Sequence, residues 1–385
     1  MSDLQAISAS RIFDGHDWHD DAALLIEFGH VSGIVRNDAI PANAEIVRLE
    51  GGMLVPGFVD LQVNGGGGVL LNNAPSVESI RTICAAHAEF GTTALLPTLI
   101  TDTVPVNVAA IAAGKAATEQ AVPGFIGLHL EGPHLSVARK GTHDPSLIRA
   151  MDDEDLARLI AARALVPHLL VTVAAETVTP TQIKALTDAG IIVSIGHSDA
   201  GLDTAAAAFG AGASMVTHLF NAMSQLGNRE PGVVGASLMD GKIFAGLIAD
   251  GIHVHPAAIS VALRAKTGPG RVFLVTDSMS QTGTDITSFT LNGRVVTRSN
   301  GALRIADGTL AGADLDMIDA IEFMHSTIGL PFGEAVRMAS LYPAEALGAE
   351  DTLGHLRPGA IASFVHLSDE RRVNSTWISG EKVFG

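Results

Sequence analysis

The sequence predicts an α/β fold, a (β/α)8 TIM-type barrel with a small β-sandwich domain that is built from both chain termini. Two observations carry this prediction. Between residues 53 and 277, strand-length apolar runs alternate with helix-length amphipathic segments, and eight such runs indicate a closed parallel sheet. Near both ends of the chain, shorter segments alternate apolar and polar residues around Gly and Asp, as strands with one exposed face do.

The domain boundaries follow from these patterns. We expect residues 1–55 to form the N-terminal part of the small β domain, residues 56–352 to form the barrel, and residues 353–385 to form the C-terminal part of the small domain. The chain length agrees with this division, because α/β barrels of about 250 residues occur as single domains.

The expected barrel strands, in chain order, are LVPGFVDLQV, TALLPTL, GFIGLHL, HLLVTVAA, IIVSIG, SMVTH, IFAGLIAD and VFLVTD. Between most of them the sequence predicts helices, at residues 77–90, 105–118, 152–164, 181–189, 199–209 and 256–267. Ser198 or Asp199 is expected to cap the helix after the fifth strand. After the eighth strand, residues 284–310 predict an inserted hairpin with Asn-Gly turns at 292–293 and 300–301, followed by helices at 315–327 and 331–347.

The composition limits the partners and the compartment. The net charge of −17 disfavours nucleic acid as a partner, and it repels anionic small molecules, so an anionic substrate needs cationic groups near its site. The single cysteine, Cys84, excludes an intramolecular disulfide and favours a cytoplasmic protein. We see neither a signal peptide nor an apolar run of about 18 residues, so we expect no membrane span and no membrane partner.

Three polar residues stand at the carboxyl ends of expected barrel strands. Glu131, His197 and His218 end the third, fifth and sixth strands, and a buried carboxylate at a strand end needs a cationic partner. For either histidine alone, a hydrogen-bonded core histidine is an equally good interpretation. One Glu and two His at matching strand ends favour a site for Zn²⁺ or a similar divalent ion. Asp277 ends the eighth strand on the same face, where barrel enzymes place their active sites.

Other histidines and a glycine-rich segment are given structural interpretations. We interpret His129 as a packed strand histidine, and His255, which precedes Pro256, as the start of a helix. The segment 65–68 lacks the Lys-Ser/Thr of a phosphate-binding loop, and we interpret it as a flexible loop near the site.

A set of motifs spread over nearly the whole chain carries a family resemblance. They are RIFDG, VPGFVDLQVNG, HLEGPHLSVARKGTH, IGHSDA, THLFNAM, ADGIHV, LVTDSM, DGTLAGADLDM, ASLYPAEALG and LRPGAIASF with ISGEKV. Through them the chain resembles the amidohydrolase superfamily, and more closely its N-acetylglucosamine-6-phosphate deacetylase family. HLEGP followed by KGTH, together with THLFNAM, is specific to the deacetylases.

The resemblance implies roles for particular residues. Glu131, His197 and His218 match the metal ligands, and Asp277 matches the general acid and base. A homodimer is implied as well, in which Arg229 acts in its own or in the neighbouring subunit's site. The positions that are implied to contact substrate are Thr142, His143, Asn221, Ala222, Arg229, His253, Leu310, Ala311, Gly312 and Ala313.

One departure from the superfamily concerns the number of metal ions. The wider superfamily carries His-x-His in the first strand, where this chain has Gln62-x-Asn64, and neutral amides bind divalent ions poorly. We therefore expect one divalent metal ion per subunit. Zinc is favoured, and iron, manganese and cobalt are the other candidates.

The resemblance and the residues together predict a metal-dependent hydrolysis. The acetamide of N-acetyl-D-glucosamine 6-phosphate is expected to yield D-glucosamine 6-phosphate and acetate by metal-activated water, with Asp277 as general base and acid and His143 at the oxyanion. Arg229 is expected to bind the phosphate, with Lys140 as the next candidate. Two alternatives stay open. One is a deacetylase of another acetamido sugar, non-phosphorylated or galacto-configured, and the other is a catalytically inactive amidohydrolase-like assembly or sensor protein.

Overall fold

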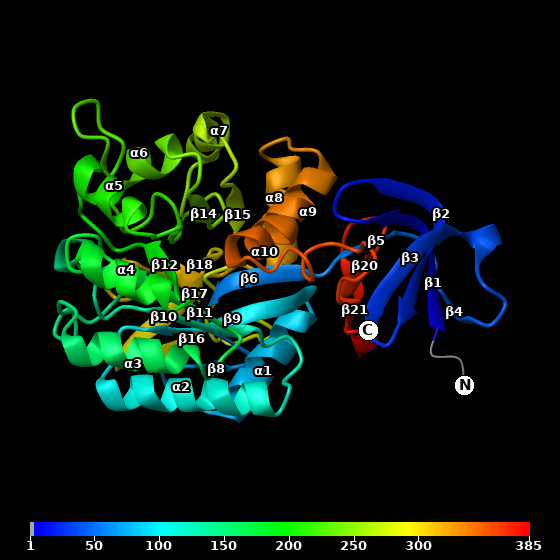
Figure 1. The fold of residues 1–385 in the computed structure, drawn as a ribbon, viewed down its shortest axis with the longest axis horizontal. Helices are drawn as coiled ribbons and strands as arrows, with labels where there is room; N and C mark the ends of the chain where they lie inside the picture. Colours follow the sequence, from blue (N-terminus) through cyan, green and yellow to red (C-terminus); the bar gives the residue numbers. More distant parts are fainter. Residues whose placement is uncertain (1–3) are drawn as a thin grey trace.

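The computed structural model describes residues 4–385, which form a barrel and a smaller β-sheet beside it (Figure 1). Eight parallel strands make the barrel, and each strand pairs with the next one along the chain. This arrangement confirms the predicted (β/α)8 barrel. The strands are β6 (Phe58–Val63), β9 (Thr92–Ile100), β10 (Gly127–Glu131), β11 (His168–Val173), β12 (Ile192–Ile195), β13 (Met215–Val216), β14 (Phe244–Leu247) and β15 (Val272–Leu274).

The barrel closes between its first and last strands, β6 and β15. The backbone N–H of Asp277 donates to the carbonyl of Gln62 (2.9 Å), and the N–H of Asn64 donates to the carbonyl of Ser278 (2.8 Å). These bonds lie at the carboxyl ends of both strands, so the seam of the barrel is at the edge where the site is expected. Just beyond β6, the short strands β7 (Gly65–Gly66) and β8 (Val69–Leu70) pair, so the glycine-rich segment forms a small hairpin rather than an open loop.

Helices cover the outside of the barrel (Figure 1). The structure adds one helix to those predicted, α6, because its sequence GVVGASLM is buried nearly all round and has no polar face to give an amphipathic period. The helices that were predicted between the strands are confirmed, with ends that agree within a few residues. The helices between the barrel strands are α1 (Val77–Ala88), α2 (Val104–Glu119), α3 (Asp153–Arg163), α4 (Pro180–Asp188), α5 (Leu202–Gly210), α6 (Gly232–Met239) and α7 (Pro256–Ala265), with the short helix η2 (Val137–Arg139) after β10. A second short helix, η1 (Asn37–Ala39), lies between two strands of the smaller sheet.

The predicted cap of α5 is wrong. The helix begins after Gly201, and neither Ser198 nor Asp199 accepts a hydrogen bond from its first turn. The carboxylate of Glu230, which precedes α6, accepts from the N–H of Leu202 instead (2.7 Å). A helix terminus can be satisfied by an acceptor from a distant segment, which a local sequence pattern does not reveal.

The segment after the barrel strands contains a four-stranded antiparallel sheet, which we call the insertion sheet. It consists of β16 (Ser288–Leu291), β17 (Arg294–Ser299), β18 (Ala302–Arg304) and β19 (Leu310–Ala313). Both predicted Asn-Gly turns are confirmed, with positive φ at Asn292 (47°) and Asn300 (53°). Three helices follow: α8 (Met317–Ser326), α9 (Phe332–Ala339) and α10 (Leu341–Leu347). The single helix predicted over 331–347 is therefore two helices, separated at Ser340, whose φ of −134° is not helical.

The smaller sheet joins both ends of the described chain. Its strand order is β22-β21-β20-β5-β1-β2-β3, and β4 pairs with β1. Phe364 and Trp377 stack in its core with ring centroids 4.8 Å apart. Strands from both ends of the sequence are thus needed to complete this unit, as predicted. They are β1 (Leu4–Phe13), β2 (Trp18–Glu27), β3 (His30–Arg36), β4 (Glu45–Arg48), β5 (Met53–Pro56), β20 (Phe364–Leu367), β21 (Val373–Ile378) and β22 (Glu381–Phe384).

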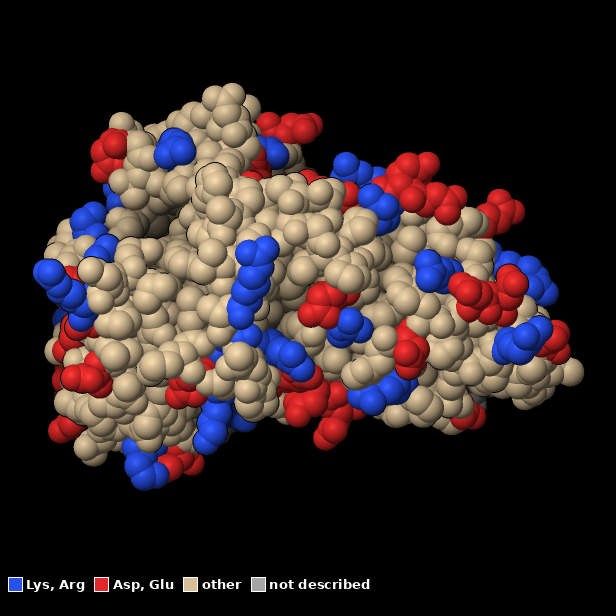
Figure 2. All heavy atoms as spheres, turned by 90° about the horizontal axis from the view of Figure 1, so that it is seen from above, with Lys and Arg blue, Asp and Glu red and all other residues tan. Residues whose placement is uncertain are grey.

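The surface carries charges of both signs. On the face drawn in Figure 2, Lys and Arg side chains are interspersed with Asp and Glu and form no continuous basic patch. Within residues 4–385, no helix combines the length and the apolar character that crossing a membrane requires.

Candidate active site

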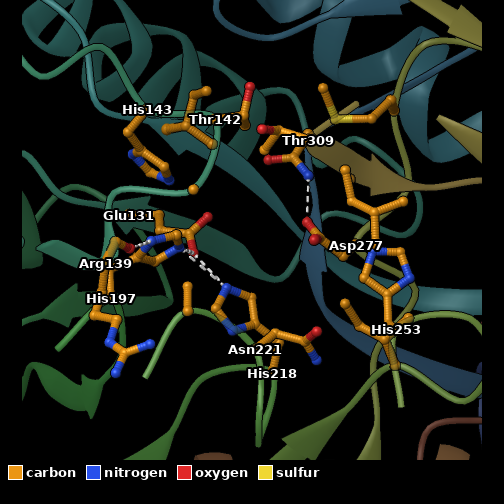
Figure 3. A pocket seen from close by; sticks show the side chains of 18 of the residues that line it. Glu131, Arg139, Thr142, His143, His197, His218, Asn221, His253, Asp277 and Thr309 are labelled. Atoms are coloured by element: carbon orange, nitrogen blue, oxygen red, sulfur yellow. Dashed lines mark hydrogen bonds and ion pairs between the residues drawn. The ribbon is translucent and has the colours of Figure 1, made fainter. Parts of the chain in front are cut away.

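A cavity of about 500 Å³ lies at the carboxyl ends of the barrel strands (Figure 3). Its volume is in the range of sites for small molecules. Side chains from barrel strands form its floor, and residues of the insertion sheet border it. The lining residues are Asn64, Ile100, Glu131, Ala138, Arg139, Gly141, Thr142, His143, His197, His218, Asn221, Ala222, Ile248, His253, Asp277, Met279, Arg304, Gly308, Thr309, Leu310 and Gly312.

The three residues predicted as metal ligands converge on the floor of this cavity (Figure 3). Oε1 of Glu131 lies 3.1 Å from Nε2 of His197 and 3.2 Å from Nε2 of His218. The two Nε2 atoms lie 3.1 Å apart. All three side chains are buried. Both histidines have positive φ, 47° and 32°, a backbone conformation that is uncommon for residues other than glycine.

The chemistry of these donors fits a divalent cation. Nδ1 of His197 lies 2.8 Å from the carbonyl of Arg139, which can only accept, so the ring proton is on Nδ1 and Nε2 presents a lone pair. Lone pairs of Nε2 and of the Glu131 carboxylate therefore point at one another. Ligands about 2.0–2.1 Å from a tetrahedral zinc ion lie about 3.3 Å apart, close to the observed separations. Although burial opposes ionisation, the two histidines hold the pKa of Glu131 well below its usual value.

His143 borders the same site. One ring nitrogen of His143, one ring nitrogen of His197 and one carboxylate oxygen of Glu131 all lie within 4.8 Å of one another. Nδ1 of His143 lies 2.7 Å from Oγ1 of Thr101 and accepts from the backbone N–H of Thr101 (3.4 Å). Because Nδ1 accepts, the ring proton is on Nε2, which can donate into the cavity. Burial, aided by the neighbouring His197, holds the pKa of His143 well below its usual value, so the ring is neutral.

Asp277 is held by two amide side chains. Nδ2 of Asn64 (2.7 Å) and Nε2 of Gln62 (3.2 Å) both donate to its Oδ1. The same Nε2 of Gln62 lies 3.4 Å from each carboxylate oxygen of Glu131. Burial raises the pKa of Asp277 to about 6, and the charge of Glu131 adds to the rise. The amides that replace the superfamily's His-x-His motif therefore position the two carboxylates of the site.

Asp60 is a buried residue that the sequence reasoning missed. Its carboxylate is fully buried and accepts from Oγ1 of Thr276 (2.5 Å) and from the backbone N–H of Gln62 (3.1 Å). Burial raises the pKa of Asp60 to about 7. Since Thr276 precedes Asp277, this contact ties the two strands of the seam together below the site. The sequence feature that could have identified Asp60 is its carboxylate within the largely apolar run of β6.

The structure brings six predicted substrate contacts besides His143 to the cavity and leaves three outside. Arg229 is exposed in the loop before α6 and does not line the cavity of its own chain, so its phosphate contact stays a prediction. The side chains of Ala311 and Ala313 are fully buried in hydrophobic clusters and do not line the cavity, so their substrate contacts also stay predictions. The backbone N–H of Ala313 donates to the carbonyl of Asp277 (2.9 Å). Those that line the cavity are Thr142, Asn221, Ala222, His253, Leu310 and Gly312.

Two structural interpretations of histidines are confirmed. His129 is buried, with Nε2 2.7 Å from Oγ1 of Thr172, so it is a packed strand histidine. His255 is the N-cap of α7, where its Nδ1 accepts from the N–H of Ala257 (3.1 Å).

Comparisons with known proteins place these features among proteins of one family. The profile of the Amidohydrolase family matches residues 53–383. The sequence is 45% identical over 337 residues to an N-acetylgalactosamine-6-phosphate deacetylase of Shewanella sp. (strain ANA-3), which covers 88% of this chain and 84% of that protein. It is 34% identical over 373 residues to an N-acetylglucosamine-6-phosphate deacetylase of Haemophilus influenzae, covering 96% of this chain and 97% of that protein.

Solved structures match the whole fold. The crystal structure of N-acetylglucosamine-6-phosphate deacetylase from Pasteurella multocida superposes with a TM-score of 0.95 at 35% identity, covering 99% of this chain and 100% of that one. A mutant deacetylase from Mycobacterium smegmatis in complex with N-acetyl-D-glucosamine-6-phosphate superposes with a TM-score of 0.91 at 31% identity, covering 100% of both chains. The similarity therefore includes the barrel and the smaller sheet.

Proposed function

Since the chain belongs to the amidohydrolase family, we propose that it hydrolyses the acetamide of N-acetyl-D-glucosamine 6-phosphate to D-glucosamine 6-phosphate and acetate. The observation that carries this proposal is the convergence of Glu131, His197 and His218 beside Asp277 in one cavity. Relatives named as deacetylases of acetamido-sugar phosphates, at 34–45% identity over most of the chain, support it.

Glu131, His197 and His218 are the residues that would hold a divalent ion, for which we propose zinc. When bound, the ion supplies Lewis acidity, which makes water a nucleophile near neutral pH and polarises a carbonyl group. The protein's part is to hold His197 in the tautomer that binds a metal. The backbone carbonyl of Arg139 does this for His197.

Asp277 is the proposed proton carrier. Its Oδ1 is occupied by two amide donors, so Oδ2 is the oxygen left to accept the proton of the attacking water. The water oxygen forms a bond to the acetyl carbon. Asp277 then gives the proton to the sugar nitrogen, so the carbon–nitrogen bond breaks with an amine as the leaving group, and acetate keeps the oxygen from water.

His143 is proposed to stabilise the charge that develops on the acetyl oxygen. Its Nδ1 accepts from Thr101, which leaves Nε2–H as the donor on the cavity side. A fixed, neutral donor in a buried site stabilises an oxyanion without reorganisation during the reaction.

The galacto-configured sugar phosphate is the second candidate substrate, because the relative at 45% identity is named as an N-acetylgalactosamine-6-phosphate deacetylase. The experiment that tests both is the release of acetate from the two epimers, each with and without the 6-phosphate. We expect the highest kcat/KM with N-acetyl-D-glucosamine 6-phosphate. A higher value for the galacto epimer selects the second candidate, and no hydrolysis of any of the four sugars contradicts the proposal.

We further propose that the enzyme is a homodimer in the cytoplasm. The exposed position of Arg229 outside its own cavity supports the dimer, because a second subunit gives this residue a site to act on. The lone, buried Cys84 supports a reducing compartment.

A further inference from the structure

Arg304 is a cation of the cavity that the sequence did not single out. It belongs to β18 of the insertion sheet, between Leu303 and Ile305, which are buried in the core of that sheet. Alternation along a strand therefore turns Arg304 to the opposite face. Its cross-strand partner is Leu310, and both residues line the cavity.

The insertion sheet is anchored beside the cavity. Arg294 donates from Nη2 to the backbone carbonyl of Thr142, and Nδ2 of Asn292 donates to the carbonyl of Thr101 (3.4 Å). Thr142 lines the cavity, and Thr101 holds His143, so the sheet is attached to segments of the active site itself. This attachment fixes where the side chains of β18 stand relative to the cavity floor.

Arg304 is less engaged than the other arginine that lines the cavity. Nε of Arg139 forms an ion pair with Asp199 (2.7 Å). Over the part of the chain that the structure describes, Arg304 makes one hydrogen bond, from Nη1 to the carbonyl of Gly308 (2.8 Å), and no ion pair. Most of the N–H groups of its guanidinium are therefore available to a ligand.

The charges of the site call for such a cation. The cavity floor carries the carboxylates of Glu131 and Asp277, and the chain as a whole has a net charge of −17, so a phosphate dianion is repelled unless a cation compensates for it. We propose that Arg304 is a specificity-determining residue that binds the 6-phosphate of the substrate, from the same chain that supplies Asp277. This role rests on the proposed function. The planar guanidinium can donate to two phosphate oxygens at once, whereas a lysine acts as a point charge.

Arg304→Ala tests the role with two substrates. We expect kcat/KM for N-acetyl-D-glucosamine 6-phosphate to fall by about tenfold to a hundredfold, mainly through KM, because a charge-assisted contact to a non-reacting group is lost. Hydrolysis of N-acetyl-D-glucosamine should be nearly unchanged. The kcat/KM of Arg304→Lys for the phosphorylated sugar should lie between those of the wild type and Arg304→Ala. Inorganic phosphate should inhibit the alanine variant more weakly than the wild type. The control is Arg264→Ala, which removes an exposed arginine of α7 and should change neither substrate.

The outcomes separate this inference from the proposed function. Equal losses on both sugars, or no loss on either, overturn the role of Arg304. If the wild type hydrolyses neither sugar, the proposed function fails. In that case calorimetry can still test Arg304. The affinities of the wild type and of Arg304→Ala are measured for N-acetyl-D-glucosamine 6-phosphate and for the unphosphorylated sugar, and a loss confined to the phosphorylated sugar shows that Arg304 binds phosphate. Melting temperatures verify folding, and Arg304→Lys replaces the alanine variant in both measurements if that variant is unstable.

Discussion

Gln62 and Asn64 give the active site a different electrostatic design from one with two metal ions. Their N–H groups point at Oδ1 of Asp277, and Gln62 also faces Glu131. The amide N–H groups therefore place partial positive charge beside the two carboxylates without a second metal ion. Asp277 is thus held by amide donors and not by a metal ion, and the Gln62 amide links its position to that of Glu131.

Asp277→Asn should retain the metal and lose activity. The side chain is not one of the three converging donors, so its loss leaves Glu131, His197 and His218 in place. Without a proton carrier, kcat should fall by at least about a hundredfold. Metal content by mass spectrometry and acetate release check the two parts. A variant that purifies without metal would show that Asp277 is a ligand.

The metal content should be about one divalent ion per chain, because neutral amides occupy the first-strand positions. His218→Ala should lose most of the bound metal together with the activity. His30→Ala, which removes an exposed histidine of the small sheet, should lose neither. Two tightly bound equivalents, both required for full activity, would contradict this expectation.

The parts of the site that the sequence predicts are those that do not depend on a contact between residues far apart in the chain. Glu131, His197 and His218 are visible because each ends an apolar run, and the barrel brings such ends together. The task of Gln62 is not visible, because its partner Asp277 is 215 positions away. Asp60 was missed for the same reason, since its carboxylate accepts from Thr276, which lies 216 positions away in the sequence.

At the level of elements, α8 carries a carboxylate that should make stability depend on pH. Asp316 caps the helix by accepting from the N–H of Asp319 (2.9 Å). Burial raises the pKa of Asp316 from 3.8 to about 7, and the charge of Asp319 adds to the rise. The folded protein therefore binds more protons than the unfolded chain in this window. Its stability should fall as the pH rises from 3.8 to about 7, with no further loss from this group above that.

Asp316→Asn should remove this dependence while keeping the cap, because Asn and Asp cap helices about equally well. The melting temperature of the variant should exceed that of the wild type at pH 8 and approach it near pH 4. Thermal unfolding across this range is the measurement, with the exposed Asp351→Asn as a control that should track the wild type. A difference between variant and wild type that stays constant with pH would contradict the expectation.

The elements themselves were largely predictable. Apolar runs mark all eight barrel strands, and Asn-Gly pairs mark two turns of the insertion sheet. The helix α6 was not predicted because it has no polar face. The acceptor at the start of α5 was not predicted because Glu230 comes from another segment. The attachment of the insertion sheet to the site depends on Arg294 reaching Thr142, 152 positions earlier, which no local pattern encodes.

For the whole molecule, Arg229 makes the oligomeric state a functional matter. It lies outside its own cavity, in a loop that also exposes Leu226 (56%). We expect a dimer in analytical ultracentrifugation. Arg229→Ala should lower kcat/KM for the phosphorylated sugar by roughly 10- to 150-fold and leave the unphosphorylated sugar nearly unaffected.

Dilution distinguishes Arg229 from Arg304. If Arg229 acts across subunits, diluting the wild type until dimers dissociate should reduce its preference for the phosphorylated sugar, whereas a contact within one chain persists. A monomer that retains full preference for the phosphorylated sugar would contradict the role of Arg229.

The seam of the barrel also sets an order of events during synthesis. The three side chains proposed to bind metal come from β10 and from the ends of β12 and β13, all of which leave the ribosome before residue 277. They can meet while the free edge of β6, which pairs with β9 on its other side, has not yet joined the growing edge of the sheet. Asp277 arrives with the last strand, and its own backbone N–H makes a bond that closes the barrel. With the proposed roles, a nascent chain in which these three side chains have met still lacks its proton carrier, and it gains that group in the same step that removes its open strand edges.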